Sequence, residues 1–161
     1  MDLNKLTTSD KVIAGAAIVF LIAMFLPWYG IDDGLGRSLN NSGWDYFLGG
    51  IIPLLLLLVM TAQILITKLS PDTKLPDPPV PWSQVHLIAG AAAAIIVVLR
   101  LLIGSDNVGS IDVGVDLDRK IGLFLAVVAA VAAAAGGFLK FQEGDAAAPP
   151  PPAGGAGSAP F

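Results

Sequence analysis

Arg100 is the charged residue with the strongest claim to chemistry, because it lies inside a long apolar run. Burying an ionised side chain costs several kcal/mol unless it is paired or reaches water. Arg100 precedes Ile103, the last residue of the run, by three positions, so its long side chain can reach polar surroundings or an acid such as Asp45. Two interpretations stay open: a snorkelling or paired structural charge, or a place on an ion or solute path. No Asp or Glu lies inside the apolar runs, so a proton relay lacks its second member.

His86 and Gln63 are two further polar side chains within the apolar runs, and Thr61 lies close to Gln63. His86 stands near the start of its run, where we expect an ordinary polar end residue, with pH sensing as the alternative. Gln63 and Thr61 are expected to hydrogen-bond a neighbouring helix, at about 0.6–2 kcal/mol per contact.

Two segments between the apolar runs are acidic, 31–45 and 104–120, and both are expected to be outer loops. Apolar residues alternate with Asp or Gly over 111–118, which predicts a short strand that pairs with the earlier acidic segment and forms a small cap. Calcium binding is the functional alternative to solvated loop charge, although the spacing does not match a calcium-binding helix-loop-helix. The candidate cap residues are Asp32, Asp33, Asp45, Asp112, Asp116 and Asp118.

Residues for catalysis and for metal binding are scarce. The chain has no cysteine and one histidine, which excludes a thiolate metal site and leaves a histidine-based zinc site with too few ligands. The sequence shows no Ser-His-Asp set and no phosphate-binding loop. The net charge is −4 and the basic residues are scattered singly, so no cationic face is available for nucleic acid. We therefore predict no catalytic residue, no metal and no cofactor.

The elements that position these residues are four apolar runs, at 12–30, 46–67, 85–103 and 121–139. The composition is 55% apolar and 14% charged, with a mean hydropathy of +0.75, which is typical of integral membrane proteins. About 20 helical residues cross the hydrocarbon layer of a bilayer. The sequence predicts an all-α bundle of four transmembrane helices whose first partner is the lipid bilayer. Bulky residues at 25–29 favour a retained first helix over a cleaved signal peptide.

The ends of the runs carry aromatic and basic residues that predict boundaries and orientation. The aromatic residues Trp28, Tyr29, Trp44, Tyr46 and Trp82 are expected to lie at the membrane interfaces. The segments on the side of the two termini carry more basic residues than the segments on the other side. The first group is Lys5, Lys11, Lys68, Lys74 and Lys140, and the second is Arg37, Arg119 and Lys120. This excess places both termini in the cytoplasm.

Small residues recur along the fourth run at intervals of four: Gly122, Ala126, Ala130 and Ala134. Such a face lets another helix backbone approach closely. Packing within the bundle is one interpretation, and a seam for a homo-oligomer or a membrane-protein partner is the other.

Two segments are rich in proline. The stretch 69–81 is expected to be a stiff, extended connection, because proline fixes φ and lacks an N–H donor. The tail 146–161 is Ala, Pro and Gly and has no apolar periodicity, so we predict disorder after a membrane domain at 1–145. Its run of four prolines, 149–152, offers a polyproline ligand as the alternative to a plain flexible tail.

Several short motifs together resemble a group of small four-span membrane proteins of actinobacteria, over about residues 9–143. They are Asp10 before the first run, FLPWY at 25–29, SGW at 42–44, LRLL at 99–102, GLFL at 122–125 and GGFL at 136–139. No activity is assigned to that group. The resemblance implies a plasma-membrane location and an actinobacterial origin, and it implies no catalytic residues. The proline-containing tail departs from the group's pattern.

The function that we expect from the sequence is a non-enzymatic structural or interaction component of the cell envelope. The alternative is a small transporter or channel subunit, or a membrane sensor, that uses Arg100 and the acidic outer loops.

Overall fold

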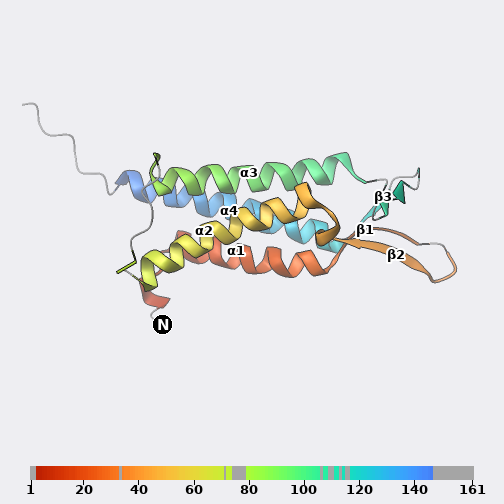
Figure 1. Ribbon diagram of the computed structural model, residues 1–161, viewed down its shortest axis with the longest axis horizontal. Helices are drawn as coiled ribbons and strands as arrows, with labels where there is room; N and C mark the ends of the chain where they lie inside the picture. Colours follow the sequence, from red (N-terminus) through yellow and green to blue (C-terminus); the bar gives the residue numbers. More distant parts are fainter. Residues whose placement is uncertain are drawn as a thin grey trace, which may run out of the picture.

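The computed structural model describes residues 3–32, 34–70, 72–73, 79–105, 107–108, 111–112, 114 and 117–146. A short 3-10 helix, Leu3–Lys5, precedes four helices that lie side by side (Figure 1): α1 Thr8–Phe25, α2 Ile52–Leu69, α3 Trp82–Ile103 and α4 Ile121–Ala146. Together with the turn that precedes α2, these make four helices that are long and apolar enough to cross a membrane. This confirms the predicted helical bundle.

Helix α4 packs closely against α3 and α1 through small residues. Gly122, Ala126 and Ala130 of the predicted face are buried. Ala134 lies against Gly90 of α3, since a Cβ added to Gly90 would be 3.0 Å from the Ala134 Cα. The small residues therefore serve contacts within the bundle, where backbones approach too closely for larger side chains.

The outward faces of the helices are also apolar. Large exposed side chains occur on all four helices; examples are Ile22, Leu58, Ile88, Ile95, Val128 and Val131. A helix that is apolar on every side suits an environment of lipid or of other helices.

Helix α1 ends at Phe25, earlier than the predicted residue 30, because the chain turns into a strand at Pro27. A residue before proline is disfavoured in the helical region, and Leu26 is extended, with φ −85° and ψ 158°. Strands β1 Pro27–Asp32, β2 Ser38–Ser42 and β5 Asp118–Arg119 form an antiparallel sheet in the order β2-β1-β5. Tyr29 pairs with Arg119, and Gly30 with Asp118, so only Asp118 of the predicted strand takes part, and its partner lies just before the acidic segment that was expected to pair with it.

The strand predicted over 111–118 is shorter than expected. Only β5 joins the three-stranded sheet, while β4 Ile111–Asp112 pairs with β3 Asn107–Val108 in a separate hairpin. Residues 113, 115 and 116 lie outside the described part of the chain.

A 3-10 turn, Gly43–Asp45, and a π-helical turn, Phe47–Ile51, lead into α2. Pro53 is the second residue of α2, directly after the π-helical turn. In the π-helical turn, the amide of Ile51 donates to the carbonyl of Tyr46 at 3.2 Å. Such turns often mark functional sites.

The N-terminus and the end of α4 lie at one end of the bundle, and the sheet lies at the other (Figure 1). Helix α4 continues past the predicted residue 139 to Ala146. The rest of the tail that was predicted to be disordered, 147–161, lies outside the described residues, as do residues 71 and 74–78 of the proline-rich connection.

Candidate functional site

Arg100 lies on the last turn of α3, at the sheet end of the bundle, against two aromatic rings. Its guanidinium carbon is 4.1 Å from the centre of the Tyr46 ring and 5.3 Å from that of Tyr29. A cation over an aromatic face is attracted by the ring quadrupole, at about 0.5–2 kcal/mol. The acid considered from the sequence, Asp45, instead accepts from the amide of Ser42 at 2.7 Å.

The two tyrosines belong to an aromatic cluster beneath the sheet. Trp28 stacks on Tyr46, with ring centres 6.2 Å apart, and meets Phe20 edge-on. Trp28 and Tyr29 are fully buried within the protein, which their interfacial residue types do not predict. Their burial follows from the early end of α1, since β1 turns both side chains into the bundle.

Hydrogen bonds fix this cluster to the end of α3. The hydroxyl of Tyr29 donates to the backbone carbonyl of Arg100, which also accepts from the amide of Gly104 at 3.2 Å. Gly104 ends α3 with φ +83° and ψ −166°, a backbone conformation that favours glycine. Burial raises the pKa of the Tyr29 hydroxyl above its ordinary value, so this group stays a donor.

The strand β5 and the residue after it attach the sheet to the helices. Arg119 donates from Nε to the carbonyl of Leu101 at 2.7 Å and from Nη2 to that of Leu102 at 3.3 Å. A cation at a helix C-terminus satisfies carbonyls that lack intrahelical partners. Lys120 pairs with Asp32 at 2.9 Å, and this hydrogen bond raises the pKa of the Lys120 ammonium.

The described aspartates of the candidate acidic cap do not come together in one site. Asp32 faces Lys120, Asp45 closes its own turn, and Asp118 lies exposed on β5. Asp33, Asp116 and the side chain of Asp112 lie outside the described residues. Among the described residues, no group of three or more His, Asp or Glu is arranged to hold a metal ion.

A pocket of about 280 Å³ opens beside Arg100, between the π-helical turn and α3. Its lining residues are Leu48, Gly49, Ile96, Leu99, Arg100 and Ile103. Gly49 lies directly against the arginine, since an added Cβ would be 3.1 Å from the Arg100 Cγ. The structure thus places Arg100 in the wall of an apolar groove that is open to the outside of the bundle.

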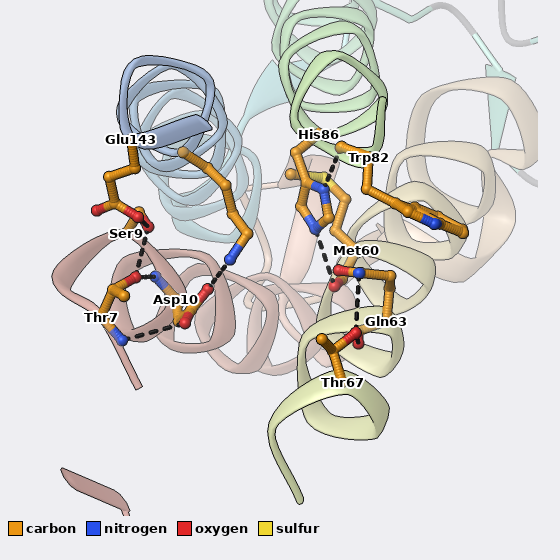
Figure 2. A network of polar contacts seen from close by, with 10 residues as sticks. Thr7, Ser9, Asp10, Met60, Gln63, Thr67, Trp82, His86 and Glu143 are labelled. Carbon is orange, nitrogen blue, oxygen red and sulfur yellow. Dashed lines mark hydrogen bonds and ion pairs between the residues drawn. The ribbon is translucent and has the colours of Figure 1, made fainter. Parts of the chain in front are cut away.

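His86 lies on the first turns of α3 and Arg100 on its last turn, so the two residues are at opposite ends of that helix. Figure 2 shows His86 beside Met60 and Gln63 of α2. The His86 ring is buried, with Nδ1 2.7 Å from the Trp82 carbonyl and Nε2 3.3 Å from the Met60 carbonyl of α2. Both partners accept hydrogen bonds, and a neutral ring donates to only one of them. His86 is therefore a contact between α3 and α2, and not the polar end residue expected from the sequence.

Gln63 and Thr61 bond within α2 and not to a neighbouring helix. Gln63 Nε2 donates to Thr67 Oγ1 at 3.0 Å, and Thr61 donates to the Leu57 carbonyl at 2.8 Å. Gln63 Oε1 is buried and has no hydrogen-bond partner among the described residues.

A polar cluster joins the start of α1 to the end of α4, and sequence reasoning missed it (Figure 2). Asp10 pairs with Lys140, and Ser9 donates to Glu143 at 2.7 Å. Asp10 also accepts from the amide of Thr7 at 3.0 Å in a capping box. The only sequence signal for this cluster is that Asp10 and Lys140, which flank different apolar runs, carry opposite charges.

Comparison with known proteins assigns no class to this fold and site: no protein-family model, no curated protein and no solved structure matches the chain.

Tyr29→Phe is expected to keep the aromatic packing but to lose the hydrogen bond to the Arg100 carbonyl. We expect a loss of about 1 kcal/mol in the free energy of unfolding, because the ring stays in place and Gly104 still donates to that carbonyl. The change is measured by titrating sodium dodecyl sulfate into the protein in mild-detergent micelles and monitoring unfolding by circular dichroism. An unfolding curve identical to wild type would contradict a role for this bond in holding β1 to α3.

Proposed function

We propose that the protein is a multi-pass protein of the bacterial plasma membrane, with both termini in the cytoplasm and the sheet outside. We also propose that it acts without catalysis, as a structural or interaction component of the cell envelope. Four apolar helices with apolar outward faces support the membrane assignment. The resemblance to the actinobacterial four-span group agrees with it.

Close packing of the helices supports a structural role over transport. An added Cβ on Gly137 of α4 would lie 2.5 Å from the His86 carbonyl of α3, so these backbones are already in contact. Helices that touch along their backbones leave little room between them for a solute path. The rival transport role would place Arg100 on such a path, but its groove lies on the outside of the bundle.

The observation that carries the interaction role is the hairpin of β1 and β2, which projects beyond the ends of the helices (Figure 1). Its side chains Leu35 and Leu39 are 88% and 61% exposed. Strand β2 is at the edge of the three-stranded sheet, and an exposed edge with apolar side chains is typical of surfaces that bind another chain. Because Arg119 and Lys120 fix the sheet to the bundle, the hairpin is held in a defined position.

A cysteine introduced on the hairpin tests both the orientation and the interaction, since the native chain contains none. We expect Leu39→Cys to react with a membrane-impermeant photoactivatable maleimide on intact cells. Irradiation should then give a discrete crosslinked species, either a second copy or a defined membrane protein. The matched control is Lys11→Cys, an exposed position at the other end of the bundle, which should react only after the cells are opened.

Labelling of Lys11→Cys on intact cells would contradict the proposed orientation. Labelling of Leu39→Cys from outside, followed by irradiation that yields only lipid adducts of a monomer, would contradict the interaction role. Replacement of Leu35 by serine in the Leu39→Cys chain should weaken the crosslinked species if the exposed leucines make the contact.

A further inference from the structure

The positive charge of Arg100 lacks a counter-charge in the described part of the chain. The ion pairs found there join Lys120 to Asp32 and Lys140 to Asp10, and none involves Arg100. Its Nε is buried without a hydrogen-bond partner. The Tyr46 and Tyr29 rings attract the cation but carry no net charge of opposite sign. A buried or half-buried charge is stable when an anion lies beside it.

The groove beside Arg100 has the shape and chemistry to receive an acyl chain. Apart from the arginine and Gly49, its lining consists of large aliphatic side chains. Leu48, Leu99 and Ile103 are exposed, so the groove opens to the surroundings of the bundle. Its volume of about 280 Å³ is close to the lower bound of roughly 300 Å³ for ligand pockets, which suits part of a lipid with the remainder outside.

The depth of Arg100 matches that of a phospholipid headgroup. It lies three residues before the end of α3, about one helical turn from the sheet. Exposed Trp44 packs edge-on against exposed Phe25 at the same end of the bundle, and such rings favour the membrane interface. Arg119, bound to the last carbonyls of α3, adds a second positive charge nearby.

We propose that this groove binds one anionic phospholipid, with the phosphate on the Arg100 guanidinium and one acyl chain along Leu48, Ile96 and Ile103. The site rests on the membrane location proposed above. A guanidinium recognises phosphate through paired N–H donors, and here the terminal nitrogens make the contact because Nε is covered. The stem of Arg100 lies against the backbone at Gly49 and its guanidinium lies over two tyrosine rings, so the cation is oriented before the lipid binds.

Native mass spectrometry of the purified, delipidated protein tests the site with phosphatidylglycerol and phosphatidylcholine as competing probes at equal concentration. We expect one lipid to be retained preferentially, with phosphatidylglycerol favoured by about tenfold. Both lipids offer a phosphate to Arg100, but the choline ammonium of phosphatidylcholine cancels the negative charge and is repelled by Arg100 and Arg119. Arg100→Gln should bring the ratio close to one. Leu48→Trp should reduce retention of both lipids, because the larger ring at this exposed position covers the groove while Arg100 remains.

Arg37→Gln is the matched control, since it removes the same charge from the exposed hairpin at the same end of the molecule. It should keep the wild-type ratio. Equal retention of the two lipids by the wild type, or an unchanged ratio in Arg100→Gln, would overturn the proposal. If Arg100→Gln does not fold, Leu48→Trp decides, and unchanged retention in that variant overturns it.

Two further results separate this inference from its alternatives. A dimer that disappears in Leu48→Trp, with no retained lipid, would show that a second copy covers the groove and would overturn the lipid site. Recovery of the chain in the soluble fraction after alkaline carbonate extraction would contradict the membrane location itself. A membrane-inserted protein without a preference for phosphatidylglycerol contradicts the lipid site alone.

Discussion

Gly137→Ala is expected to destabilise the protein by about 2–3 kcal/mol, the upper part of the range for overpacking a tight contact. The added methyl group would lie 2.5 Å from the carbonyl oxygen of His86 and 3.0 Å from its carbonyl carbon. Both atoms are backbone, so α3 has to move away from α4 as a unit. Movement of α3 would also disturb the contact between the His86 ring and the Met60 carbonyl on α2. The effect therefore spreads from one interface to a second.

Gly15→Ala is the matched control for this prediction. Gly15 lies within α1 and is exposed, and an added Cβ there meets nothing within 4 Å. Alanine is favoured over glycine in a helix by about 1 kcal/mol, so the control should be as stable as wild type or slightly more stable. The two variants are compared by their unfolding in sodium dodecyl sulfate, monitored by circular dichroism. Equal unfolding midpoints for Gly137→Ala and Gly15→Ala would contradict close packing of α3 on α4.

The four helices and the small-residue face could be predicted because both signals are local and repeated. Hydropathy accumulates over about 20 residues, and the spacing of Gly122, Ala126 and Ala130 marks one side of a helix whatever its neighbour is. A sheet at this end of the bundle could also be expected, but the pairing of β5 with Tyr29 and Gly30 could not, because those residues lie in the run predicted as the first helix. The predictable features depend on pattern and not on exact tertiary geometry.

The surroundings of Arg100 could not be predicted in the same way. Tyr29 and Tyr46 have the composition of interfacial residues, and only the chain reversal after Leu26 turns Tyr29 inward. Whether an aromatic side chain at a helix end faces lipid or faces a cation depends on how two distant segments meet. The sequence also suggests an acid for Arg100, but Asp45 is taken by the amide of Ser42. A local hydrogen bond of this kind competes with any distant partner.

The contact between Asp10 and Lys140 was missed for a related reason. Asp10 has a sufficient local explanation, since it completes a capping box with Thr7. Nothing in the sequence shows that the same carboxylate also meets a lysine 130 residues away. Both residues flank apolar runs at the same end of the bundle, which makes the pairing possible but does not specify it.

Lys140→Met is expected to be among the most destabilising single changes, at about 3 kcal/mol. The Asp10 side chain is 0% exposed and that of Lys140 is 18% exposed, so removal of the lysine leaves a carboxylate buried without its counter-charge. The hydrogen bond from the Thr7 amide to Asp10 remains, but it supplies no full positive charge. The start of α1 should therefore separate from the end of α4.

Addition of Asp10→Asn to Lys140→Met should restore most of the lost stability. The asparagine keeps an oxygen for the Thr7 amide, and the buried charge is gone. Glu143→Gln is the control on the same helix, where an exposed side chain bonds Ser9 and a change within about 0.5 kcal/mol is expected. If Lys140→Met behaves like Glu143→Gln, the pair is no more than a surface contact. If the double variant is as unstable as the single one, the loss comes from the packing of the lysine stem against α1, and the charge of Asp10 is tolerated without a partner.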